Sequence, residues 1–62
     1  MRTKAEITKE IEELDAVIKA RHEMIGEAFR TNNRLMYECA MNDISRVEAY
    51  KSDLLALMSR MA

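Results

Sequence analysis

Two stripes of apolar residues, each with the period of an α-helix, run along the chain on either side of a short polar stretch. The first stripe consists of Ile7, Ile11, Leu14, Ile18, Ile25 and Ala28. The second consists of Tyr37, Ala40, Ile44, Val47, Lys51, Leu54, Met58 and Met61. Both advance by alternating steps of four and three residues, with one position of the first stripe taken by Arg21, and this is the spacing of a coiled-coil seam. We therefore predict two long amphipathic helices.

The polar stretch 31–33 marks a change of phase between the two stripes. If the first stripe continued beyond it, the stripe would lose its apolar character, because it would run through Asn32, Leu35, Cys39, Asn42 and Arg46. Asparagine tolerates the left-handed conformation that ends a helix and also caps the start of a new one. We predict an all-α antiparallel helical hairpin, with helices over 4–30 and 34–61 and a bend at 31–33. One straight helix with a stutter and three helices broken at Asn42-Asp43 are the alternatives.

Four residues in or next to the first helix bear on its ends and its contacts. Thr3 with Glu6 matches a capping box, which places the start of the helix there. Gly26 either ends the helix or lies inside it at a cost of about 1 kcal/mol relative to alanine, and the helix-forming residues after it favour the second. Arg21 falls within the apolar stripe. Either its stem covers apolar surface while the guanidinium reaches solvent, or it forms a buried ion pair that fixes the register or the partner.

The length of the chain limits what its core can supply. Its 62 residues allow one domain, 1–62, and Cys39 is the only cysteine, so no disulfide can form within the chain. A core this small seldom supplies more than about 3–5 kcal/mol. We expect the missing stability to come from association, with two hairpins docking as a homodimer into a four-helix bundle. The predicted contact residues are apolar side chains beside the stripes, namely Val17, Met24, Tyr50, Leu55 and Leu57.

Composition gives no sign of a catalytic, metal or cofactor site. His22 is the only histidine, and the positions one turn away are Lys19 and Gly26, so no second metal ligand accompanies it. Cys39 lacks a recognisable base, without which a thiol is a poor nucleophile. With 10 basic and 11 acidic residues, the net charge is -1, which argues against nucleic acid and against an acidic membrane surface as partners. No apolar run approaches the roughly 18 residues of a membrane span, and we expect a cytoplasmic protein without enzymatic activity.

These features favour a small protein-interaction module, such as an adaptor, an inhibitor or an assembly chaperone with a regulatory role. It would act by presenting an amphipathic helical face to itself or to another protein. Two alternatives stay open: an RNA-binding regulator built as a dimeric four-helix bundle, and a purely structural coiled-coil element. Salt separates the first alternative from the main hypothesis, because counterion release makes nucleic-acid binding fall steeply as salt rises.

Overall fold

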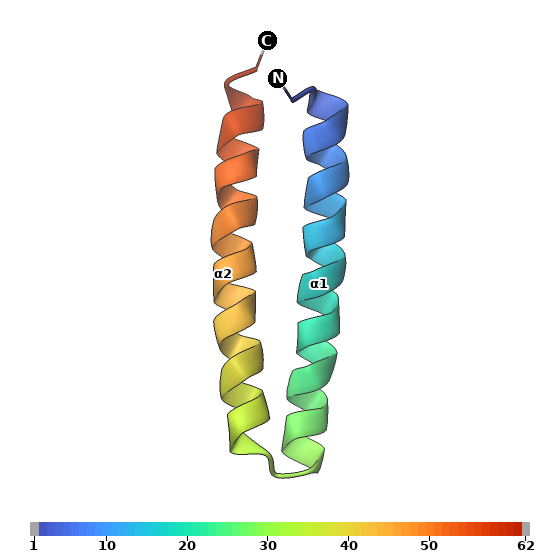
Figure 1. The fold of residues 1–62 in the computed structure, drawn as a ribbon, viewed down its shortest axis with the longest axis vertical. Helices are drawn as coiled ribbons and strands as arrows, with labels where there is room; N and C mark the ends of the chain where they lie inside the picture. The colour runs from blue at the N-terminus through green and yellow to red at the C-terminus, as the bar shows by residue number, and fades with distance from the viewer. Residues whose placement is uncertain (1, 62) are drawn as a thin grey trace.

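The computed structural model describes residues 2–61, which form two helices joined by a short loop (Figure 1). Helix α1 spans Lys4–Arg30 and helix α2 spans Arg34–Ser59. The helices lie side by side in opposite directions, and both ends of the chain meet at the same end of the molecule (Figure 1). The predicted hairpin is therefore confirmed, and α2 ends at Ser59 rather than at position 61. Neither a single rod nor a break at Asn42-Asp43 is present, because α2 runs through both residues.

The start of α1 is closed by the predicted capping box. The backbone N–H of Glu6 donates to Oγ1 of Thr3 at 3.1 Å, and the backbone N–H of Thr3 donates to Oε1 of Glu6 at 3.2 Å. Gly26 lies inside α1, as the sequence favoured. A Cβ atom at this position would meet only the Arg30 side chain, at an ordinary 3.7 Å. Gly26 is therefore required neither by a turn nor by contact with α2.

The two asparagines of the bend act on different helices: Asn32 ends α1 and Asn33 starts α2. Asn32 adopts a left-handed conformation with φ of 53°. The backbone N–H groups of Asn32 and Asn33 donate to the carbonyl oxygens of Phe29 and Ala28, at 3.3 Å and 2.8 Å, which is the hydrogen-bond pattern of a Schellman motif. Asn33 then caps α2, since its side chain accepts from the backbone N–H of Met36 at 3.0 Å. The bend is thus closed entirely by local hydrogen bonds.

The core is a single line of contact between the helices, formed by residues of the two stripes, and we call this line the seam. The buried apolar residues are Ile7, Ala28, Ala40, Ile44 and Leu54. All five belong to the two predicted stripes, and most of the other stripe residues are half-buried. Two helices can bury only the sides that face each other, so the flanks of the seam stay accessible.

The hairpin is elongated and exposes more surface than a compact chain. Its extents are 48 × 15 × 14 Å and its radius of gyration is 14.4 Å, whereas a compact chain of this length is expected to have roughly 10.6 Å. Its accessible surface is 4809 Å², against roughly 4,100 Å² for a compact protein of this mass. The difference is roughly 700 Å². Within residues 2–61, neither helix combines the length and the apolar character that a membrane span requires.

Candidate interaction surface

Each helix carries a row of side chains on either side of the seam, because successive residues of an α-helix are turned by about 100°. We call one side the Tyr50 flank, made of Glu10, Val17, Met24, Met36, Asp43, Tyr50 and Leu57. Each of these residues comes directly before a residue of the seam, namely Ile11, Ile18 and Ile25 in α1 and Tyr37, Ile44, Lys51 and Met58 in α2. We call the opposite side the Asp15 flank, made of Thr8, Asp15, His22, Phe29, Arg34, Met41, Glu48 and Leu55. In an antiparallel pair, corresponding rows of the two helices lie on the same side of the seam.

Contacts across the Tyr50 flank establish that its two rows are neighbours. The Tyr50 hydroxyl donates to Oε1 of Glu10 at 2.5 Å. Closer to the loop, Nε of Arg21 donates to Oδ2 of Asp43 at 3.0 Å. Both contacts join a residue of α1 to a residue of α2 on one side of the seam.

Contacts across the Asp15 flank show the same for the opposite side. Nζ of Lys51 donates to Oδ1 of Asp15 at 2.5 Å, and the Thr8 hydroxyl contacts the sulfur of Met58. The seam positions that make these contacts, Lys51 and Met58, reach towards this flank, whereas Arg21 reaches towards the other. The hairpin therefore has two distinct long faces.

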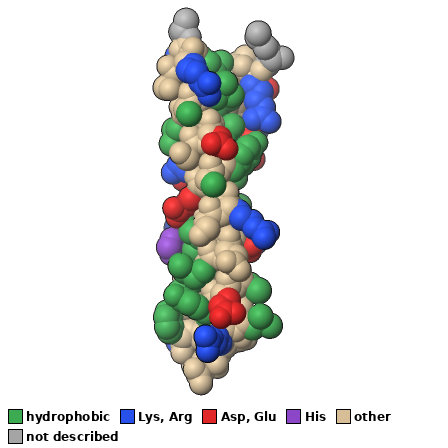
Figure 2. Space-filling view, turned by 90° about the vertical axis from the view of Figure 1, so that its left-hand side faces the viewer, with side chains coloured by type: hydrophobic (Ala, Val, Ile, Leu, Met, Phe, Trp, Pro, Cys, Tyr) green, Lys and Arg blue, Asp and Glu red, His purple; other side chains and the backbone are tan. Residues whose placement is uncertain are grey.

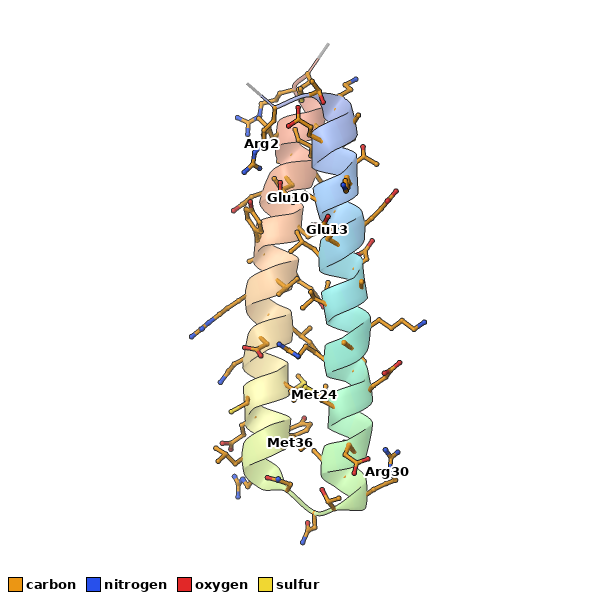
Figure 3. All side chains as sticks on the ribbon, turned by 45° about the vertical axis from the view of Figure 1, so that its right-hand side comes forward. Arg2, Glu10, Glu13, Met24, Arg30 and Met36 are labelled. Carbon is orange, nitrogen blue, oxygen red and sulfur yellow. The ribbon has the colours of Figure 1, made fainter. Side chains whose placement is uncertain are left out.

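The Tyr50 flank is the more apolar of the two. Five of its seven residues are apolar or aromatic, and Val17, Tyr50 and Leu57 are 37%, 41% and 39% exposed. Met24 and Met36 are half-buried, and both lie toward the loop end of the hairpin (Figure 3). At the open end, Leu57 lines a small hollow together with Ile7 and Met61. The apolar row thus extends from the loop to the free ends of the helices.

Glu10, one of the two acidic residues of the Tyr50 flank, is held by side chains of the same hairpin. It accepts from the Tyr50 hydroxyl through Oε1 and from Nη1 of Arg2 at 2.8 Å through Oε2. Arg2 and Glu10 lie together at the end that carries the termini (Figure 3). A side-chain hydrogen bond with Tyr50, followed by the charge of Glu10, raises the pKa of Arg2.

Asp43, the second acidic residue of this flank, is paired with Arg21. The two side chains are 36% and 43% exposed, so the pair is not buried, and a second guanidinium nitrogen of Arg21 lies 3.4 Å from the sulfur of Met24. The ion pair expected of Arg21 is therefore present and links the helices, but it is half-exposed and not buried. Burying a charged group without a partner is strongly destabilising. Because both carboxylates of this flank already have partners, another protein can cover the flank without burying an unpaired charge.

The structure divides the predicted contact residues between the flanks. Val17, Met24, Tyr50 and Leu57 share the Tyr50 flank, whereas Leu55 lies on the Asp15 flank with an exposed fraction of 48%. The Asp15 flank also carries four ionisable residues. Figure 2 views the outer face of α2, where charged side chains are spread along the surface and hydrophobic ones gather at both edges toward the loop end.

Comparison of the chain with protein-family models, with curated proteins and with solved structures found no match. The surface must therefore be interpreted from its own chemistry. Among residues 2–61, no group of three or more histidine, cysteine, aspartate and glutamate side chains is arranged to hold a metal ion. Cys39 is an exposed thiol.

Sequence reasoning missed several residues of this surface. Glu10 and Asp43 were not selected, although each lies seven residues from a selected one, Val17 and Tyr50, and that spacing is the signal that finds them. Phe29 was also missed. It is 72% exposed, and its ring centroid lies 5.3 Å from that of Tyr37. Its place directly after the buried Ala28 puts it off the seam, which the helical period alone indicates.

Proposed function

We propose that this chain is a small non-enzymatic protein-interaction module that docks through the Tyr50 flank. The observation that carries the proposal is the apolar row along the whole hairpin, half-exposed, with both of its carboxylates already bonded to partners within the chain. Contiguous apolar surface of this kind on a small protein usually marks an interaction site. The mechanism is docking of one helical face on another, with apolar side chains providing affinity and charges providing orientation.

The size of the flank fits this role. A specific protein interface buries about 800 Å² on each partner. Multiplying the 48 Å length of the hairpin by its 15 Å width gives a face of roughly 700 Å², similar to the surface that the hairpin exposes in excess of a compact chain. Covering one long face would therefore bring the exposed surface close to that of an ordinary globular protein.

Docking of two further helices on this flank would complete a four-helix bundle. The two helices are supplied either by a second copy of the chain or by another protein. In the second case the chain acts as an adaptor, an inhibitor or an assembly chaperone, because it would cover a helical face that its partner otherwise leaves exposed.

Leu55 and Leu57 offer a matched test of the proposal. They are the same residue type, lie on the same helix and have similar exposure, but they belong to opposite flanks. The chain would be immobilised as wild type, Leu57→Ser and Leu55→Ser, and exposed to cell extract and to the free chain itself. We expect protein, whether the chain or another, to be retained at high salt by wild type and Leu55→Ser and lost from Leu57→Ser.

Two results would contradict the proposal. Equal retention by both serine variants would show that the Tyr50 flank is not the docking surface. Retention of nucleic acid that is released as salt rises, with no dependence on Leu57, would favour the RNA-binding alternative, since that affinity comes from phosphate contacts.

A further inference from the structure

We infer that the occupant of the Tyr50 flank is a second copy of this chain, related by a two-fold axis parallel to the long axis of the hairpin. In this arrangement α1 of each copy lies beside α2 of the other, and the two loops are at the same end. The inference rests on the proposed docking function, and it adds the identity of the partner and its orientation. Three features of the flank support it: its area, its internal charge balance and the charges at its edges.

The area is what a stable dimer needs. Two faces of roughly 700 Å² each would bury roughly 1,400 Å² in total, which lies within the range of about 1,200–2,000 Å² for specific complexes. Among residues 2–61, the hairpin offers five buried residues as its own core. A self-complementary face supplies the missing burial without requiring a different protein, and closed two-fold pairing is the commonest form of oligomer.

The charge balance of the flank permits it to face itself. A two-fold interface brings each residue near a copy of its own surroundings, so an unbalanced flank would repel its copy. Here Glu10 is bonded to Arg2, and Asp43 is bonded to Arg21. Each copy therefore presents two neutral pairs between apolar side chains, and neither pair needs a partner from outside.

The edges of the flank carry opposite charge on the two helices. Next to the flank, on the side farther from the seam, α1 carries a row of residues that we call the α1 rim: Glu6, Glu13, Ala20 and Glu27. The corresponding α2 rim consists of Cys39, Arg46, Asp53 and Arg60. The α1 rim thus carries three carboxylates, of which Glu27 is paired with Arg30 of the same helix, whereas the α2 rim carries two arginines and one carboxylate. Among the described residues, neither Arg46 nor Arg60 forms an ion pair within the hairpin.

These rims select between the two ways of docking the flank on its copy. A two-fold axis parallel to the hairpin sets the α1 rim of each copy against the α2 rim of the other, at both edges. Glu6 then lies near the level of the partner copy's Arg60, whereas Glu13 lies near the level of Asp53. The preference for this axis therefore rests on the net charges of the two rims and not on matched pairs along them. An axis perpendicular to the hairpin would instead set the three carboxylates of one α1 rim against the same three of the other. Like charges placed together at an interface suppress that arrangement.

The single thiol of the chain provides the test. Cys39 is exposed on the α2 rim near the loop, and Glu27 lies on the α1 rim near the loop. In the parallel arrangement, position 27 of each copy lies opposite position 39 of the other, at two symmetric places. Within one hairpin, the two positions lie on opposite edges of the flank. The variant Glu27→Cys should therefore form covalent dimers on oxidation, linked between positions 27 and 39.

Glu23→Cys is the matched control. It also replaces a glutamate of α1 by cysteine, one turn earlier, but on the face that points away from α2 and from the flank. A preformed pair holds its thiols at an effective concentration of order millimolar, so at a chain concentration of about 10 μM we expect Glu27→Cys to cross-link roughly a hundredfold faster than Glu23→Cys. Non-reducing electrophoresis measures the rate, mass spectrometry of the linked peptides identifies the 27–39 bond, and circular dichroism verifies that both reduced variants are helical.

Sedimentation equilibrium of the reduced chain measures whether it is a monomer or a dimer, and this result is combined with the cross-linking rates. A dimer with fast 27–39 cross-linking supports the inference. A dimer in which Glu27→Cys cross-links no faster than Glu23→Cys overturns the parallel orientation. A helical monomer at tens of micromolar overturns the second copy as the occupant, and the proposed docking function is then decided separately by the dependence of protein retention on Leu57.

Discussion

Replacing Leu54 by alanine should remove most of the stability of the hairpin, whereas the same change at the neighbouring Leu55 should remove little. Leu54 is 3% exposed and is one of five buried residues in the described part of the chain, while Leu55 is 48% exposed. Leucine-to-alanine changes in a packed core cost about 2–5 kcal/mol. Because the whole core of so short a chain supplies roughly 3–5 kcal/mol, Leu54→Ala should leave the helices largely unfolded at 25 °C.

The loss of stability expected for Leu55→Ala is small because about half of the Leu55 side chain is already exposed to solvent. Fully burying a leucine contributes about 1.5–3 kcal/mol, and about half of this side chain is accessible, so Leu55→Ala should cost about 1 kcal/mol. Leu57 is similar in the isolated hairpin, at 39% exposed. If the Tyr50 flank is covered by a partner, Leu57→Ala loses that burial as well and should cost about 1 kcal/mol more than Leu55→Ala.

Urea unfolding followed by far-UV circular dichroism measures these differences on wild type and the three alanine variants. The experiment is done at one chain concentration and repeated at about tenfold dilution, because stability gained by association depends on concentration. Equal losses at Leu54 and Leu55 would refute the assignment of the seam as the core. A larger loss at Leu55 than at Leu57 would show that the Asp15 flank is the covered one.

Three further changes test individual features of the hairpin. Gly26→Ala should stabilise it by about 1 kcal/mol and raise the melting temperature by roughly 4–8 °C, and a loss measured by thermal melting would mean that another helix packs against this position. Asn32→Ala should cost about 1 kcal/mol because alanine is strained at φ of 53°, whereas Asn32→Gly should not; urea titrations compare the two. Asp43→Asn should cost about 0.2–1 kcal/mol at low salt, and this difference should shrink in high salt as screening weakens the pair with Arg21.

The hairpin could be predicted from the sequence because its determinants are local. Ile7 and Leu54 are buried because they belong to stripes with a helical period, and the period is visible without knowledge of the partner helix. The bend was found for the same reason: Asn32 and Asn33 form their hydrogen bonds with residues at most five positions away. A reading of periodicity and capping residues captures structure of this kind.

The division of the surface into two flanks was beyond that reading, because it depends on how the two helices are placed relative to each other. The helical period alone puts Leu55 and Leu57 on opposite sides of their stripe, but only the contacts across the seam show which residues of α1 share a side with each of them. Glu10 resembles any solvated carboxylate until Tyr50, 40 positions along the chain, donates to it. Pairings across such separations follow from the register of the hairpin, and residue spacing along one helix does not encode them.

The Arg21–Asp43 pair constrains what can cover the Tyr50 flank. In the hairpin alone it is half-exposed, and pairs of this kind contribute about 0.2–1 kcal/mol. A covering partner removes water from both side chains, and breaking the pair at that stage would leave a desolvated charge, which is far more expensive than the pair is worth in solvent. A partner that competes for Asp43 is therefore disfavoured, and one that packs apolar side chains around the intact pair is favoured. Val17, Met24 and Tyr50 would then provide affinity, while the ion pair would keep α1 and α2 linked beside them.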